Sequence, residues 1–256
     1  MIDILSPLID DICNVGDMAY EKYRSDVKVT YKSDNTPVTN VDQLIHAEIL
    51  KSLTHFFPDI PVISEEGSIP SFNKRKNMEQ FWLLDPLDGT VDFINETDEF
   101  VISLGLISKK KPNVGIIHHP VSGKTWIAIS KCGVFVKDHG GNIQPVKETI
   151  KRDEYIILVS AHRNDDDLSA IIARQRQREL NRPVNVVKMG SALKLASLAD
   201  GSADEYLRFT PMKEWDFAAG HCLVEEAGFS VFPLDNESSI NYGSKDLMIP
   251  AISIRK

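Results

Sequence analysis

Two aspartates near the middle of the chain have the type and spacing that metal-assisted phosphate chemistry requires. Asp85 and Asp88 stand three positions apart and are followed by Gly89 and Thr90. Carboxylate oxygens are the ligands that Mg²⁺ prefers, and backbone amides at the start of a helix bind phosphate oxygens. Gly89 lets a ligand approach the backbone closely, and Thr90 adds a hydroxyl. The segment therefore predicts a site that binds a hard cation and a phosphate group together.

A buried strand should carry these aspartates. Phe81 to Leu84 is a run of four apolar residues, which is typical of such a strand. Pro86 disfavours helical backbone at Asp85, so we expect the Asp85 carboxylate to project where the strand ends. An isolated Asp-Gly pair is more often an exposed turn. Here the preceding strand and the second carboxylate favour the metal and phosphate site.

Three more carboxylates stand at the ends of predicted elements. Asp42 falls in the first turn of a predicted helix, where a negative charge is favourable in itself. Glu65 follows the predicted strand 61–64 and is either a further metal ligand or a solvated loop residue. Asp216 opens a helix whose small residues at 218–220 permit close packing, and a capping role is the alternative. Local evidence leaves both interpretations open for each.

The composition limits the partners. The chain has 256 residues, with 37 acidic and 29 basic side chains and a net charge of −8, which disfavours duplex nucleic acid or an anionic membrane as main partner. Cys13, Cys132 and Cys222 form no CxxC pair, so neither a disulfide framework nor a structural zinc site is indicated. Residues 1–20 do not resemble a secretory signal, and no stretch reaches the length of a membrane span. We expect a cytoplasmic protein.

The charged stretch 147–154 predicts a hinge between two halves, with a boundary near residue 150 that gives lobes at 1–150 and 151–256. In the first half, helices are predicted at 2–23 and 41–53, strands at 27–31, 61–64, 81–84, 101–107, 113–118, 125–129 and 133–137, and a surface loop at 68–77. In the second half, strands at 155–160, 184–188 and 203–209 alternate with helices at 167–180, from 191, and at 215–228. Such alternation predicts an α/β lobe.

The second half also carries candidate anion-binding groups. Ser191 follows Gly190 at a predicted helix start, and Lys194 lies one turn further on. A helix N-terminus after glycine is suited to an anion, although Ser191 could equally be an N-cap. Arg208 closes the last predicted strand.

Four segments together resemble the inositol monophosphatase superfamily of magnesium-dependent, lithium-sensitive phosphatases. They are residues 36–42, 63–66, 82–90 and 214–220. The resemblance spans nearly the whole chain. It implies an α/β (α+β) fold, a layered αβαβα sandwich of the inositol monophosphatase and sugar phosphatase type, and metal-assisted hydrolysis of phosphate monoesters.

Within the superfamily, the segments 160–163, 190–194 and 206–209, with Pro211 before Trp215, look most like 3′(2′),5′-bisphosphate nucleotidases of the CysQ type. The expected reaction is hydrolysis of the 3′-phosphate of 3′-phosphoadenosine 5′-phosphate (PAP) to AMP and phosphate, which recycles a by-product of sulfate assimilation. Two departures are present. Residues 91–93 read Val-Asp-Phe where these enzymes usually read Lys-Glu-Phe, and 228–229 read Gly-Phe in place of Gly-Gly.

The resemblance assigns roles residue by residue. Two or three Mg²⁺ ions would be held by the side chains of Glu65, Asp85, Asp88 and Asp216 and the Leu87 carbonyl. Thr90, hydrogen-bonded to Asp42, would orient and help deprotonate the attacking water, and the amides of Gly89 and Thr90 would hold the scissile phosphate. The nucleoside and its second phosphate would be bound by Ser160, His162, Gly190, Ser191, Lys194, Arg208 and Asp216.

Three alternatives differ in substrate or class. The same fold could dephosphorylate inositol or a sugar phosphate, but Lys194, Arg208 and Lys213 favour a second phosphate over a neutral polyol. Phosphatases of the haloacid dehalogenase type need two aspartates two positions apart, and here the spacing is three. A non-catalytic cation or nucleotide sensor would not need the Thr90 and Asp42 pair. We expect a small-molecule substrate and no nucleic acid polymer; a homodimer and peripheral attachment at the inner membrane are left open.

Overall fold

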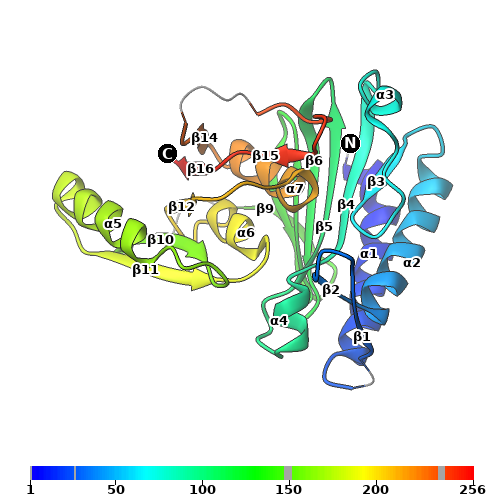
Figure 1. Ribbon diagram of the computed structural model, residues 1–256, viewed down its shortest axis with the longest axis horizontal. Helices are drawn as coiled ribbons and strands as arrows, with labels where there is room; N and C mark the ends of the chain where they lie inside the picture. The colour runs from blue at the N-terminus through cyan, green and yellow to red at the C-terminus, as the bar shows by residue number, and fades with distance from the viewer. Residues whose placement is uncertain (1, 26, 147–151, 236–239) are drawn as a thin grey trace.

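The computed structural model describes residues 2–25, 27–146, 152–235 and 240–256, and these form five layers. From right to left in Figure 1 the layers are two helices, a large sheet, two helices, a smaller sheet and one helix. The predicted αβαβα sandwich is confirmed. No helix among the described residues is long and apolar enough to cross a membrane.

The first layer consists of α1 (Ile2–Lys22) and α2 (Asn40–Phe56). Both were predicted, because their apolar residues recur at helical spacing and bury one face. Thr39 is the N-cap of α2, and its hydroxyl accepts hydrogen bonds from the amides of Val41 and Asp42. The buried residues of these helices pack with one face of the large sheet.

The large sheet has seven strands in the order β3-β4-β5-β6-β7-β8-β9. The strands are β3 (Val62–Ser64), β4 (Gln80–Asp88), β5 (Val101–Ser108), β6 (Lys111–His119), β7 (Lys124–Ile129), β8 (Gly133–Lys137) and β9 (Ile143–Pro145). β3 and β4 are parallel, and every other neighbouring pair is antiparallel. Glu65 and the end of β4 therefore lie at the same edge of the sheet.

The smaller sheet has five strands in the order β11-β10-β12-β16-β14. They are β11 (Val184–Met189), β10 (Tyr155–Ser160), β12 (Glu205–Arg208), β16 (Ile252–Arg255) and β14 (Ser230–Pro233). β10 runs parallel to both β11 and β12. The residues that follow these three strands consequently meet at one edge, which is where α/β sheets bind ligands.

The middle helical layer consists of α6 (Leu193–Ala199) and α7 (Glu214–Glu226), and α5 (Asp166–Leu180) covers the outer face of the smaller sheet. α7 lies very close to the large sheet because glycines face it. A Cβ on Gly115 would lie 2.2 Å from the carbonyl oxygen of Ala219, and one on Gly105 would lie 2.7 Å from the Cβ of Ala218. The close approach predicted from the small residues of this helix is confirmed.

Shorter elements complete the fold. β1 (Val29–Tyr31) pairs with β2 (Pro37–Thr39), and β13 (Met212–Lys213) pairs with β15 (Met248–Ile249). α3 (Phe72–Arg75) is a short helix inside the segment predicted as a loop, and α4 (Thr90–Ile94) follows β4.

Several predicted boundaries were wrong. β1 begins at Val29 and not at residue 27, and α7 ends at Glu226 and not at residue 228. β4 does not end before Asp85 but continues to Asp88, with an irregular register against β5 between these two residues. This bulge accommodates Pro86, which cannot donate a ladder hydrogen bond. The helix expected from residue 191 begins at Leu193, since Ser191 has a left-handed φ of 43°. The strand predicted at 203–209 is shorter, Glu205–Arg208.

The predicted hinge at 147–154 falls partly outside the described residues. The division into lobes at 1–150 and 151–256 stays a prediction.

Candidate active site

The turn from β4 into α4 is built as the sequence requires for close approach of a ligand. Gly89 has a left-handed φ of 98°, and a Cβ there would lie 2.8 Å from the carbonyl oxygen of Glu99. Asp85 accepts a hydrogen bond from the amide of Leu87 at 3.1 Å. The Thr90 hydroxyl lies 3.1 Å from the Leu87 carbonyl oxygen. The turn thus presents carboxylate, carbonyl and hydroxyl oxygens together.

Three carboxylates from three elements converge next to this turn. Glu65, Asp85 and Asp216 each offer an oxygen, and these oxygens lie within 4.8 Å of one another. Glu65 follows β3, Asp85 lies in β4, and Asp216 lies in the first turn of α7. Trp215 donates its indole N–H to Glu65 at 3.1 Å, and the Lys213 amide donates to Asp216 at 3.2 Å. Three of the predicted ligands, Glu65, Asp85 and Asp216, are therefore brought together from distant parts of the chain.

The charges in this cluster disfavour its ionised state. Burial, together with the neighbouring carboxylates Asp88 and Glu65, raises the pKa of Asp216 to about 8. Burial likewise raises the pKa of Asp85 well above its usual range, with Glu65 adding to the effect. A divalent cation would compensate both the burial and the repulsion. An all-oxygen set of crowded carboxylates fits a hard cation such as Mg²⁺.

Lys32 supplies a positive charge to the edge of the cluster. Its ammonium group donates to Glu65 at 2.8 Å and to Glu66 at 2.6 Å. These carboxylates raise the pKa of Lys32 despite its partial burial. Sequence reasoning missed this residue, because nothing in the polar turn between β1 and β2 indicates which distant acid it meets.

Asp88 occupies a different position from the three clustered acids. Its carboxylate accepts a hydrogen bond from the amide of Ala192, just before α6. Burial raises the pKa of Asp88 to about 6, and nearby Lys194 acts in the opposite direction. Asp88 thereby connects the turn after β4 to the second half of the chain.

The predicted water-positioning pair is also formed. The Thr90 hydroxyl lies 3.1 Å from the carboxylate of Asp42, although the two residues are 48 positions apart. The other oxygen of Asp42 accepts from the amide and hydroxyl of Thr39. Burial raises the pKa of Asp42 to about 6. Asp42 therefore completes the capping box of α2 and also contacts Thr90, so the two interpretations of this residue are compatible.

Positive charge lies across from the carboxylates. Lys194 is buried, which lowers its pKa to about 8, and Asp88 partly offsets that effect. Its ammonium group donates to the carbonyls of Met189, at 3.0 Å, and Ser191. Arg208, at the end of β12, donates to the carbonyl of Thr210 at 3.1 Å. Both cations are therefore held by backbone carbonyls, and neither forms an ion pair with an acidic side chain in the described part of the chain.

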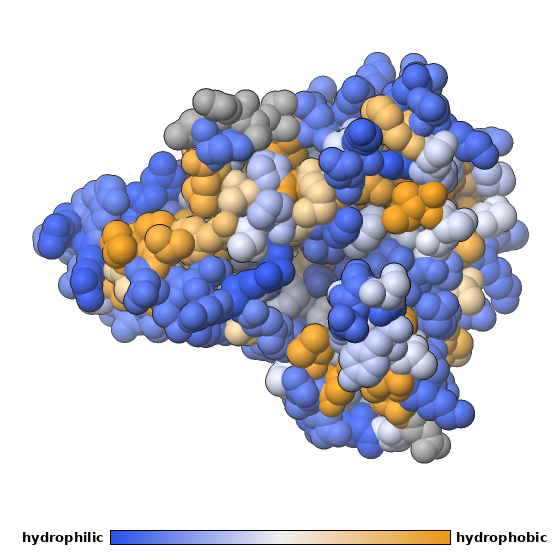
Figure 2. Space-filling view, in the orientation of Figure 1, coloured by the Kyte–Doolittle hydropathy of each residue, from blue (hydrophilic) through white to orange (hydrophobic). Residues whose placement is uncertain are grey.

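One cleft of about 650 Å³ joins the two groups of charges. Figure 2 shows the hollow between the smaller sheet's lobe and the part of the molecule that carries α4. The predicted residues that line it are Glu65, Asp85, Leu87, Asp88, Gly89, Thr90, Ser160, His162, Ser191, Lys194, Arg208 and Asp216. Asp42 and Gly190 stand behind the lining. Gly190 instead donates its amide to Glu99 at 2.7 Å.

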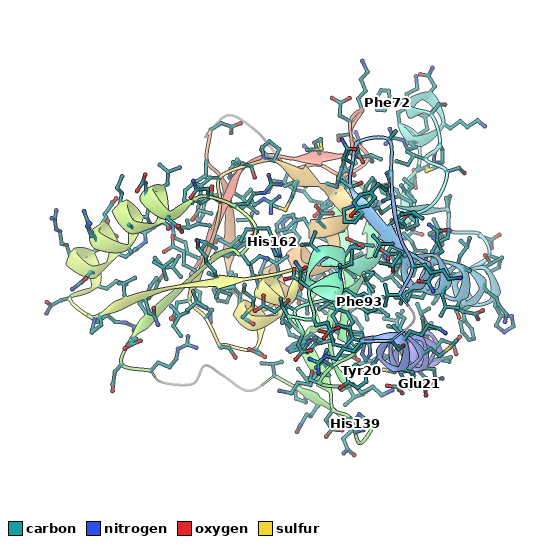
Figure 3. All side chains as sticks on the ribbon, turned by 60° about the horizontal axis from the view of Figure 1, so that its bottom comes forward. Tyr20, Glu21, Phe72, Phe93, His139 and His162 are labelled. Carbon is teal, nitrogen blue, oxygen red and sulfur yellow. The ribbon has the colours of Figure 1, made fainter. Side chains whose placement is uncertain are left out.

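His162 follows β10 and lies beside α4 (Figure 3), where its Nε2 is 2.7 Å from the carboxylate of Asp92. Sequence reasoning noted Asp92 only as a departure from the usual Glu and gave it no role. The sequence signal that could have indicated one is its place two residues after Thr90.

Comparison with known proteins agrees with this geometry. The profile of the inositol monophosphatase family matches residues 5–254. The 3′(2′),5′-bisphosphate nucleotidase CysQ of Haemophilus influenzae is 35% identical over 228 residues, covering 89% of this chain and 82% of that protein. CysQ of Escherichia coli K12 is 32% identical over 258 residues, covering 92% and 98%.

Solved structures show the same fold. The crystal structure of CysQ from Bacteroides thetaiotaomicron, described as a bacterial member of the inositol monophosphatase family, matches with a TM-score of 0.84 at 27% identity, over 99% of this chain and 96% of that one. An inositol monophosphatase of Thermotoga maritima matches with a TM-score of 0.74 at 22% identity, over 99% and 92%. On the family match and these relatives, the chain belongs to the inositol monophosphatase family.

Proposed function

We propose that this protein is a Mg²⁺-dependent, lithium-sensitive 3′(2′),5′-bisphosphate nucleotidase that converts PAP to AMP and phosphate. One observation carries the proposal: a single cleft places the carboxylate cluster opposite Lys194 and Arg208. A metal bound by the carboxylates and the two fixed cations provide separate positive regions for two phosphate groups. A monophosphate of a neutral polyol would use only the first of these regions.

The metal would be bound by Glu65, Asp85, Asp88, Asp216 and the Leu87 carbonyl, as two or three Mg²⁺ ions. When bound, it would neutralise the phosphate oxygens and favour formation of the nucleophile from water. In this proposal Asp88 uses the oxygen that does not accept from Ala192.

The chain's own groups supply positioning and proton transfer. Thr90 can accept the proton of an attacking water while donating its own hydrogen to Asp42, since their oxygens lie 3.1 Å apart. The amides of Gly89 and Thr90, at the start of α4, would hold the scissile phosphate. Ser160, His162, Ser191, Lys194 and Arg208 would bind the nucleoside and its other phosphate, with Gly190 supporting the turn before α6.

The lobes have separate tasks in this proposal. Residues 1–150 carry most metal ligands, and 151–256 carry the nucleotide-binding groups and the last ligand, Asp216. We also propose a cytoplasmic location, with a homodimer and peripheral membrane attachment as open alternatives.

The test is release of phosphate with Mg²⁺ from PAP and from inositol 1-phosphate, each with and without lithium. We expect a strong preference for PAP and inhibition by lithium. Preference for inositol 1-phosphate would retain the metal site but refute the roles given to Lys194 and Arg208. Binding of PAP without any turnover would indicate a sensor in place of an enzyme.

A further inference from the structure

We propose that Asp92 is a positioning residue for nucleoside recognition, which acts by holding the His162 ring at the edge of the cleft. The inference rests on the proposed function. It gives a role to a residue at which this chain departs from the usual sequence of the related enzymes.

Asp92 is anchored on both of its oxygens. It is 1% exposed. One oxygen lies 2.7 Å from Nε2 of His162, and the other accepts from the hydroxyl of Thr97 at 2.8 Å. The Thr97 amide also donates to the Asp92 carbonyl at 3.1 Å. Because both oxygens of the carboxylate are restrained, the carboxylate can hold the His162 ring in one orientation.

His162 is held at one end and free at the other. Its side chain is 44% exposed, and it lines the cleft. Because the carboxylate accepts a hydrogen bond, Nε2 carries the hydrogen, and Nδ1 of the neutral ring is then an acceptor. Nδ1 has no hydrogen-bond partner among the described residues. This nitrogen suits a donor on the nucleoside, such as a ribose hydroxyl or a base amino group.

Asp92 also joins the two halves of the cleft. It lies in α4, two residues after Thr90, whereas His162 follows β10 of the smaller sheet. Next to it is Gly190, where an added Cβ would lie 2.5 Å from the Asp92 carboxylate. The short side chain at position 92 and the missing side chain at position 190 therefore fit each other. Through Asp92, the helix α4 therefore holds the His162 ring, which comes from the smaller sheet's side of the cleft.

The experiment is a double-mutant cycle of Asp92→Ala and His162→Ala. Michaelis constants are measured for PAP and for p-nitrophenyl phosphate, a monoester without a nucleoside. We expect each single variant to raise the KM for PAP about tenfold, the value of one good hydrogen bond, with little change in kcat. The double variant should be no worse than His162→Ala alone, because Asp92 acts through the ring.

A matched control is Glu96→Gln, an acid-to-amide change four residues away at an exposed position whose ion pair with Arg24 is long, at 3.7 Å. It should leave both Michaelis constants unchanged. If Asp92→Ala does not give folded protein, the same cycle is made with Asp92→Leu, which keeps the branched shape of the side chain but cannot accept a hydrogen bond from His162.

The outcomes are distinct. Additive effects in the cycle, or an equal loss for both substrates, would overturn the role of Asp92, because it would then only support the turn after β4. Failure of the unchanged protein to hydrolyse PAP would overturn the proposed function itself.

Discussion

Replacement of Gly115 by alanine tests whether the packing of α7 on the large sheet positions the active site. An added Cβ would lie 2.2 Å from the carbonyl oxygen of Ala219 and 3.0 Å from the Cβ of Cys222. Neither atom can rotate away, because the Ala219 oxygen belongs to the backbone and the Cys222 Cβ is bonded directly to the backbone of the same buried helix. The helix must therefore move away from β6 by about 1 Å, and Asp216, one turn before Ala219, would move with it.

The magnitude combines two opposing effects. Forcing an extra methyl into a packed core costs about 1–3 kcal/mol, and the loss of backbone freedom in the unfolded chain returns about 0.4–1 kcal/mol. The net destabilisation is about 1–2 kcal/mol, which corresponds to a fall in Tm of about 2–8 °C for a protein of this size. A displacement of about 1 Å at a catalytic group can lower the rate by about 10²-fold.

The assay compares Tm, from circular dichroism, with kcat for PAP. The matched control is Gly140→Ala in an exposed turn, where the added Cβ would lie 3.2 Å from a side-chain oxygen of Asp138. We expect this control to retain both Tm and kcat. If Gly115→Ala keeps both values as well, the rigid coupling between β6, α7 and Asp216 is refuted.

Three other predictions follow from the site and the core. Asp216→Asn should abolish turnover. In the presence of a chelator its Tm should stay the same or rise, because burial raises the pKa of the Asp216 carboxyl to about 8 and the neutral amide removes the repulsion from the neighbouring carboxylates. A fall in Tm would contradict this account. Arg208→Ala should raise the KM for PAP about tenfold and leave that for a monophosphate unchanged; an equal loss for both would show that Arg208 does not bind the second phosphate. Burial lowers the pKa of His118 from 6.5 to about 3. Below pH 6.5, His118 therefore takes up a proton in the unfolded chain but not in the folded protein. The free energy of unfolding falls as the pH falls from 6.5 towards 3. At pH 5 the loss is about 2 kcal/mol, and urea titrations should show a smaller loss between pH 7 and pH 5 in His118→Gln; an identical loss would refute the assignment.

The helices and most long strands could be predicted because their signal is local. The apolar residues of α1 and α2 recur at helical spacing, and the strands of the large sheet are separated by short turns. The strands β14, β15 and β16 were missed. They have four, two and four residues, and each is stabilised by pairing with a strand that is distant in the sequence.

The site residues also differ in how far they could be predicted from the sequence. The residues of the carboxylate cluster could be named beforehand because they stand at the ends of predicted elements in segments typical of a family. The contacts of Lys32 and Asp92 could not, since each meets a partner brought to it only by the fold. The predicted end of the strand before Asp85 was wrong because β4 continues past Pro86 through a bulge.

The position of α7 between the two sheets has a consequence for how the protein fails on heating. Its residues from Phe217 to Val224 are buried without interruption. The amides of this helix can therefore exchange their hydrogens with solvent only when the layers separate, at a free energy close to that of complete unfolding. Asp216 is held by the same helix, so no partial opening can release it first. Loss of activity and loss of structure should be one event, while the outer helix α5 is free to open earlier without effect on the carboxylate cluster.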